Sequence, residues 1–273
     1  MSAPMFRILS LFLLLLSGMV SAVEPIRIAG STTAQPLVDE IARLYLDKYP
    51  QARLEVAGGG SGSGIAALIA RDVDIAMSSR LISAGEVEQA VRLGIYPVPL
   101  QLAHDAIAPV VHPRNPLRDL SRDQLSDIYL GRSLSWATLG GPDVPIGVVC
   151  RDRNSGTRAS WQHLALNGTP AQACSIDVAS NQEVLEAVRS NQASIGYVSL
   201  AFISAHAGVR PLQVEGQDCT PYCIKSGCYP LTRPLFLFTN GWPDGKLMHF
   251  INFALHSEQA KQVIRRAGLI PAN

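Results

Sequence analysis

The sequence predicts an α/β protein of two lobes, each a mostly parallel sheet flanked by helices, with two crossings of the chain between the lobes. Short apolar runs of strand length alternate with amphipathic helical patterns, which is typical of strand–helix–strand units. Two long apolar runs, residues 97–111 and 231–239, favour extended strands that cross from one lobe to the other. Loops rich in glycine and hydroxyl residues follow several strands, where α/β sheets usually bind ligands.

The first lobe is predicted from three strand–loop–helix units in succession. We expect strands at residues 26–29, 54–57 and 73–77, and helices that run from about Leu37 to Tyr49, begin near Ile65 and span 84–93. Pro50 stops the first helix because proline cannot continue one. This succession implies parallel strands with their loops at one edge of the sheet.

The second lobe follows the first long apolar run. We expect helices at residues 121–130, 155–166, 181–189 and 200–205, and strands before Arg151 and at 175–178 and 194–198. The run at 231–239 then returns the chain, so that helices at 245–255 and 257–267 pack on the first lobe. The predicted organisation is a leader at 1–22, lobe 1 at 23–104 and 235–273, and lobe 2 at 105–234.

The stretch CRDRNSGTRASW, residues 150–161, is the strongest candidate for a binding site. An apolar strand leads into a loop that contains Arg151, Ser155, Gly156 and Thr157, and a helix begins there. Free N–H groups at a helix start attract an anion, hydroxyl groups add donors, and an arginine fork matches a tetrahedral oxyanion. An ordinary capped helix is the alternative, since Ser and Thr are common caps.

Other functions are less consistent with the sequence. The glycine-rich loop GGGSGSG, residues 58–64, lacks the Lys of a phosphate-binding P-loop and the distal acidic residue of a dinucleotide site. The formal net charge of +1 and the absence of a basic stripe argue against nucleic-acid binding. No metalloprotease or hydrolase motif occurs, and Ser155 and His163 are poorly spaced for a nucleophile and its base. We therefore expect no enzyme activity, no cofactor and no metal site.

Residues 1–22 predict an export signal without a lipid anchor. One positive charge at Arg7 precedes an apolar core at 8–16 and a small-residue ending at 20–22, and no cysteine follows. In an oxidising compartment, five cysteines predict one or two disulfides and one remaining thiol. Cys150 and Cys174 suit a bridge between neighbouring strands, whereas a local bridge is expected among Cys219, Cys223 and Cys228. Zinc is disfavoured because no paired C-x-x-C spacing or histidine completes a ligand set.

Six motifs in order resemble the PstS-like periplasmic phosphate-binding proteins of ABC transporters. They are AGSTTAQPL, GGGSGSGI, DIAMSSR, RNSGTR, IGYVSL and YPLTRPLFLF, and they span some 210 residues of the chain. The resemblance implies the two-lobed type II periplasmic-binding-protein fold, which closes on a desolvated phosphate. It also implies a monomer in the periplasm that delivers phosphate to an ABC permease in the inner membrane.

The resemblance assigns phosphate contacts by position. The residues implied are Ser31, Thr32, Thr33, Ser61, Ser79, Arg151, Ser155, Gly156 and Thr157. Many family members carry an acidic residue where this chain has Ser79 or Arg153, so its selectivity for phosphate over sulfate is open. Extra positive charge from Arg80, Arg153 or Arg158 would favour a more highly charged anion, unless these residues form salt bridges. The alternatives are a receptor for another oxyanion such as sulfate or arsenate, a sensor, or a secreted adhesion protein.

Overall fold

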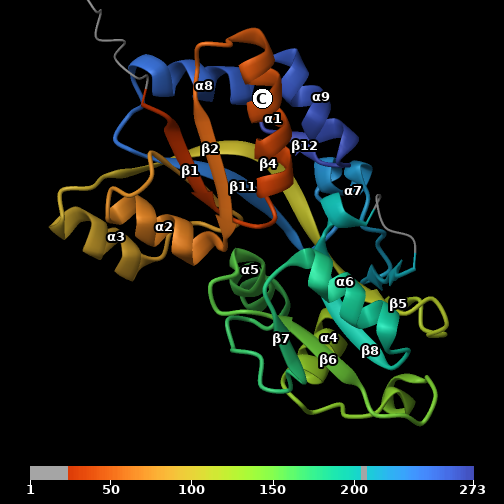
Figure 1. Ribbon diagram of the computed structural model, residues 1–273. Coiled ribbons are helices and arrows are strands. Elements are labelled where there is room, and N and C mark those ends of the chain that lie inside the picture. The colour runs from red at the N-terminus through yellow and green to blue at the C-terminus, as the bar shows by residue number, and fades with distance from the viewer. Residues whose placement is uncertain (1–23, 204–207) are drawn as a thin grey trace, which may run out of the picture.

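The computed structural model describes residues 24–203 and 208–273 and contains a curled sheet covered by helices (Figure 1). In this part of the chain, the order of strands along the sheet is β2-β1-β3-β11-β4-β8-β6-β7, and β9 and β12 also pair with β4. The strands are β1 (Ile26–Gly30), β2 (Leu54–Gly59), β3 (Ile75–Ser78), β4 (Pro97–Val111), β6 (Gly147–Arg151), β7 (Ile176–Val178), β8 (Ser194–Ser199), β9 (Arg210–Pro211), β11 (Thr232–Asn240) and β12 (Ile270–Pro271). A separate pair is formed by β5 (Asp119–Leu120) and β10 (Gln213–Val214).

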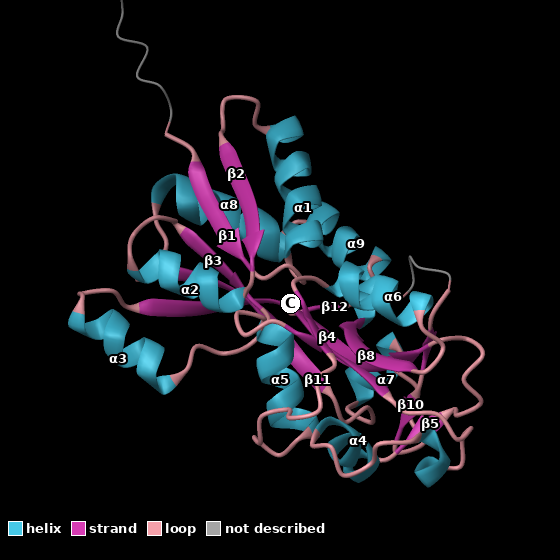
Figure 2. Ribbon diagram, turned by 60° about the horizontal axis from the view of Figure 1, so that its bottom comes forward, coloured by secondary structure: helices cyan, strands magenta, loops and turns pink. Residues whose placement is uncertain are grey.

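Helices cover both faces of the sheet (Figure 2). They are α1 (Gln35–Lys48), α2 (Ser61–Ile69), α3 (Ala84–Arg92), α4 (Arg122–Tyr129), α5 (Gly156–Ala165), α6 (Asn181–Ser190), α7 (Pro221–Ser226), α8 (Gly245–His256) and α9 (Glu258–Arg266). Serine hydroxyls cap several of these helices by accepting a backbone N–H, as Ser83 does for α3 and Ser155 does for α5. None of the described helices is long and apolar enough to cross a membrane.

Two strands join the lobes, as the long apolar runs predicted. β4 pairs with β11 as far as Ala106 and then with β8 from Ile107 onward, both antiparallel. Figure 1 shows β4 and β11 running from the group of β1, β2 and α1 to the group of β6, β8 and α6. Seven consecutive residues at the end of β4 are buried, because the strand is covered on both faces there. The two-lobed α/β architecture with two crossings is confirmed.

The structure differs from the predicted elements at a few short segments. β3 begins at Ile75 rather than at residue 73. At Asp74 the contact with β1 involves a side chain, because the Arg27 backbone N–H donates to the Asp74 carboxylate at 2.8 Å while the Asp74 backbone N–H donates to the Arg27 carbonyl at 2.9 Å. The helix predicted at 200–205 is a 3-10 turn at Leu200–Phe202, and residues 204–207 lie outside the described chain. The predicted leader at 1–22 also lies outside it. α7, β5, β9, β10 and β12 were not predicted, because they are too short to show a periodic pattern.

Two disulfides link cysteines that the sequence had grouped. Cys150 in β6 is bonded to Cys174 just before β7, and Cys223 in α7 is bonded to Cys228. β6 and β7 are neighbouring parallel strands, so the first bridge joins adjacent segments. Cys219 is the remaining thiol, and burial raises its pKa well above the usual range. The structure therefore has two bridges and one free thiol, which agrees with the expectation of one or two disulfides and one remaining thiol.

The Cys150–Cys174 bridge should stabilise the fold more than the Cys223–Cys228 bridge. The two bridges close loops of 24 and 5 residues, for which the chain-entropy relation gives about 3.5 and about 2 kcal/mol. We expect urea unfolding of the Cys150→Ala/Cys174→Ala variant to show the larger loss of unfolding free energy. An equal or smaller loss than for Cys223→Ala/Cys228→Ala would contradict this ranking.

Candidate functional site

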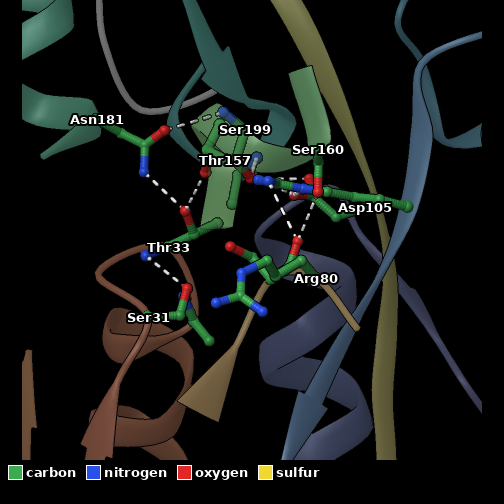
Figure 3. A network of polar contacts seen from close by, with 12 residues as sticks. Ser31, Thr33, Arg80, Asp105, Thr157, Ser160, Asn181 and Ser199 are labelled. Carbon is green, nitrogen blue, oxygen red and sulfur yellow. Dashed lines mark hydrogen bonds and ion pairs between the residues drawn. The ribbon is translucent and has the colours of Figure 1, made fainter. Parts of the chain in front are cut away.

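The predicted site residues come together where loops of the two lobes meet. Ser31, Thr32 and Thr33 follow β1, Ser61 opens α2, and Ser79 follows β3. From the other lobe, Arg151 ends β6, Ser155 caps α5, and Gly156 and Thr157 begin that helix. Thr33 Oγ1 lies 3.0 Å from Thr157 Oγ1 (Figure 3). Arg151 Nη2 lies 3.0 Å from Thr32 Oγ1. The residues proposed from separate motifs thus form one cluster.

Arg151 places a buried positive charge in this cluster. Its side chain donates to the carbonyls of Val178 and Ala179 and to Thr32, and the residue is 1% exposed. Among the described residues, no carboxylate forms a salt bridge with it, and Nη1 is buried without a hydrogen-bond partner. Burial lowers the pKa of the Arg151 guanidinium, because water no longer solvates the charge. An anion beside Nη1 would supply the missing partner.

Tyr197 holds the backbone of Arg151 in place. Its hydroxyl oxygen accepts the Arg151 backbone N–H at 3.1 Å, and its ring stacks on Trp161 of α5 at 4.6 Å between centroids. Burial raises the pKa of Tyr197 to about 12, so the phenol remains neutral at physiological pH. A neutral aromatic layer therefore positions the Arg151 backbone, whereas the carbonyls of Val178 and Ala179 and the Thr32 hydroxyl hold the guanidinium.

The hydroxyl groups of the cluster accept hydrogen bonds from N–H groups of the protein. Ser31 Oγ accepts the backbone N–H groups of Thr33 and Ala34, and Ser155 Oγ accepts that of Arg158. Ser61 Oγ and Thr32 Oγ1 accept in the same way, from the Ser79 backbone and from Arg151. A hydroxyl has one hydrogen, so an oxygen that accepts from the protein keeps that hydrogen for another acceptor. Ser61 Oγ also lies 3.3 Å from Ser79 Oγ, so one hydrogen of that pair can be shared between them. The other hydroxyls can donate to a ligand that has acceptor oxygens.

Glycines let the loops of the two lobes approach each other. A Cβ atom on Gly156 would overlap Ser61 Oγ and lie 2.6 Å from Ser79 Oγ. Gly60 is equally confined, because its added Cβ would lie 2.7 Å from the Asn154 carbonyl oxygen. That carbonyl also accepts the Gly62 N–H at 3.0 Å, which ties α2 to the loop before α5. The enclosed geometry depends on residues without side chains at these points.

The neighbouring arginines are largely neutralised by salt bridges. Arg80 pairs with Glu86 at 2.7 Å, and Arg158 pairs with Asp177 at 2.7 Å, whereas Arg153 is exposed. Two of the three extra cations considered from the sequence therefore have partners outside the cluster. Arg151, by contrast, is buried without such a partner among the described residues and donates to the Thr32 hydroxyl.

Sequence reasoning missed several buried polar residues around the cluster. Asn181 bridges Thr33 and Ser199, while Asp105 pairs with Arg233 at 2.9 Å and accepts from Ser199 Oγ at 2.8 Å. Arg233 lies within the LTRPL motif, and a charged residue in an otherwise apolar strand could have indicated a buried ion pair. Asn181 opens a helix, so its type and position also fit an ordinary helix start.

Comparisons with known proteins agree with this geometry. Residues 20–258 match the family model described as the PBP superfamily domain. The chain belongs to the PBP superfamily. Within this superfamily, the phosphate-binding protein PstS of Bacillus subtilis is 29% identical over 255 residues, which cover 93% of this chain and 83% of that protein. The resemblance to PstS-like proteins is therefore confirmed.

Solved structures of PBP superfamily relatives share the fold. A substrate-binding protein assigned to a phosphate ABC transporter of Clostridium perfringens, solved with bound phosphate, has a TM-score of 0.84 and 29% identity. The alignment covers 92% of this chain and 100% of that chain. An ABC-type phosphate transport receptor of Vibrio cholerae has a TM-score of 0.74 and 33% identity over 90% of this chain and 99% of that one.

Gly156→Ala should prevent the two sides of the cluster from enclosing a small oxyanion. Because the added methyl group meets Ser61 and Ser79, we expect affinity for inorganic phosphate, used as a test oxyanion, to fall at least about tenfold. Calorimetric titration measures this change. Gly85→Ala is the matched control, because a Cβ at Gly85 meets nothing within 4 Å. Equal affinities for the two variants would contradict the proposed role of Gly156.

Proposed function

We propose that this chain is a periplasmic solute-binding protein that captures inorganic phosphate between its lobes and delivers it to an ABC permease. The observation that carries this proposal is the buried Arg151, which forms no salt bridge with a carboxylate in the described part of the chain and donates to the Thr32 hydroxyl across the two lobes. A charge taken out of water needs a counter-charge with good hydrogen bonds. The relative from Clostridium perfringens was solved with phosphate bound, which supports this ligand.

The proposed phosphate contacts are the hydroxyl, backbone and guanidinium groups of the cluster. We assign them to Ser31, Thr32, Thr33, Ser61, Ser79, Arg151, Ser155, Gly156 and Thr157. Thr33 Oγ1 already accepts a hydrogen bond from Asn181 and lies beside Thr157 Oγ1. Thr33 would therefore contact phosphate through its backbone N–H or through a hydrogen of this hydroxyl pair. Many charge-assisted hydrogen bonds in a site shielded from water would supply the affinity.

Closure of the two lobes is the proposed route of capture. We place lobe 1 at residues 23–104 and 235–273 and lobe 2 at 105–234, which is supported by the change of β4 partner between Ala106 and Ile107. Direct contacts between the lobes, such as Thr33 with Thr157 and Ser160 with the Ser79 carbonyl at 2.9 Å, would form as the cleft shuts. The bound anion would add its own bonds to both sides and so favour the closed arrangement.

Export and partners follow from the same proposal. Residues 1–22 would direct the chain to the periplasm, and the two disulfides fit an oxidising compartment. The Vibrio cholerae relative is named as an ABC-type phosphate transport receptor, which supports a permease partner. We propose that the protein acts there as a monomer and is not an enzyme.

A second candidate function is a receptor for another oxyanion. The hydroxyl oxygens that accept N–H groups leave hydrogens for donation, and Asp105 is committed to Arg233 and Ser199. Hydrogen phosphate carries a proton that needs an acceptor, whereas sulfate carries none. This arrangement favours weak discrimination between phosphate, arsenate and sulfate.

Titration of the mature chain with phosphate, sulfate and arsenate tests both candidates. We expect phosphate to bind, and Arg151→Ala and Thr157→Ala each to weaken binding at least tenfold, about 1.4 kcal/mol or more. Arg43→Ala is the control, because Arg43 is exposed on α1 and pairs there with Glu40 and Asp47. Calorimetry gives the dissociation constants.

The outcomes separate the candidates. Preference for sulfate over phosphate would favour the second candidate, and failure to bind any of the three anions would reject both. If no anion binds, a secreted adhesion role is the remaining alternative. A sensor role would require that the protein binds an anion and that deletion of its gene leaves phosphate uptake unchanged.

A further inference from the structure

We infer that Asn181 is a positioning residue for the anion site, which orients the Thr33–Thr157 hydroxyl pair so that one hydroxyl hydrogen faces the anion. This inference rests on the proposed function. Asn181 is the first residue of α6 and is fully buried. Its side chain lies between the end of β8 and the loop after β1, and therefore links the two lobes (Figure 3).

The orientation of the Asn181 amide follows from its backbone neighbour. The Ser199 backbone N–H lies 3.1 Å from the Asn181 side chain and can only donate. The Asn181 atom that faces Ser199 must therefore be the carbonyl oxygen, Oδ1. Its amide nitrogen, Nδ2, then faces Thr33 Oγ1 at 3.0 Å. Because an amide nitrogen only donates, the Thr33 hydroxyl oxygen is an acceptor in this contact.

Because Asn181 donates to Thr33, the Thr33 hydroxyl hydrogen is not used in that contact. Thr33 Oγ1 and Thr157 Oγ1 are 3.0 Å apart, and both residues are at most 2% exposed. The two hydroxyls have two hydrogens, of which one forms the bond between them. Neither hydroxyl forms another hydrogen bond within the described chain, so the second hydrogen remains available for the ligand. Asn181 therefore donates to the hydroxyl pair, and the pair in turn can donate one hydroxyl hydrogen to the ligand.

The end of β8 keeps Asn181 in this orientation. Ser199 Oγ donates to Asp105 Oδ1 at 2.8 Å, and Asp105 Oδ2 accepts from Arg233 Nε at 2.9 Å. Both members of that ion pair lie on the crossing strands β4 and β11, opposite each other in the ladder. The Ser199 backbone is therefore anchored to the part of the fold that joins the lobes. Rotation of the Asn181 amide would leave the Ser199 N–H without an acceptor.

An aspartate at this position would reverse the chain of hydrogen bonds. A carboxylate accepts on both oxygens, so it would accept the Ser199 N–H and also draw the Thr33 hydroxyl hydrogen toward itself. Thr157 would then donate to Thr33, and neither hydroxyl hydrogen would face the anion. The same change adds a negative charge near the ligand. Asparagine donates to Thr33 through its amide nitrogen and adds no negative charge.

A double-mutant cycle between Asn181 and Thr33 tests the inference. We expect Asn181→Ala to weaken phosphate binding roughly five- to tenfold and Thr33→Val to weaken it by a similar factor. In the Thr33→Val background, Asn181→Ala should add less than about a twofold loss, because the link to Thr157 is already removed. Gln182→Ala is the matched control on the same helix, since its amide bonds Glu186 on an exposed face.

The pH profile of Asn181→Asp gives a second readout. We expect Asn181→Asp to lower the affinity for phosphate roughly a hundredfold at pH 8. This loss of affinity should shrink as the pH falls, because the new carboxyl becomes protonated. A protonated carboxyl donates to Thr33 again while its carbonyl oxygen accepts from Ser199. The affinity of each variant is divided by that of the wild type at the same pH, which cancels the ionisation of phosphate. Gln182→Glu controls for added charge on α6.

The results distinguish this inference from the proposed function. Urea unfolding of each variant establishes that it folds. If the wild-type chain binds none of the anions, the proposed function fails and the inference fails with it. If the wild type binds phosphate but the losses from Asn181→Ala and Thr33→Val are additive, or Asn181→Ala has no effect, the inference alone is overturned.

Discussion

The buried positive charge of Arg151 is the constraint on which the arrangement of the site depends. Moving a guanidinium out of water costs several kcal/mol unless hydrogen bonds and an opposite charge compensate it. The carbonyls of Val178 and Ala179 and the Thr32 hydroxyl accept hydrogen bonds from the Arg151 guanidinium, but no carboxylate among the described residues forms a salt bridge with it. This incomplete compensation is the physical basis of our proposal that the site binds an anion.

The hydrogen-bond directions around Arg151 support this proposal. Ser31, Ser155 and Ser61 each have an oxygen occupied by a backbone N–H of the protein. Hydroxyl groups can donate or accept, and in water they would serve ligands of either kind. Here the surrounding backbone occupies both lone pairs of Ser31 Oγ and one lone pair each of Ser155 Oγ and Ser61 Oγ. The neighbours of these hydroxyls therefore favour donation by the hydroxyl hydrogens.

The fold contributes by bringing together loops that are distant in the chain. β4 and β11 run through both lobes, and the Asp105–Arg233 ion pair lies between them. Polar contacts extend from this pair to Ser79 on one side and to Ser199 on the other. The crossing strands therefore connect the lobes and also carry a buried ion pair that contacts residues of both lobes, Ser79 in lobe 1 and Ser199 in lobe 2. Close approach of these loops also requires glycine at positions 60 and 156.

Local patterns in the sequence determined the longer strands and helices, the two crossings and the loops that contribute to the candidate site. Alternation of short apolar runs with amphipathic helices is a local property, and so is the position of Ser155 and Thr157 at a helix start. The tertiary structure alone decided which residues face one another. Asn181 contacts Thr33 across 148 positions of sequence, and no local pattern encodes that pairing. Sequence spacing also left open the salt-bridge partners of Arg80 and Arg158 and the direction of each hydroxyl hydrogen bond. Only the tertiary structure decided them, because hydrogen bonds depend on distances of about 3 Å that sequence spacing does not specify.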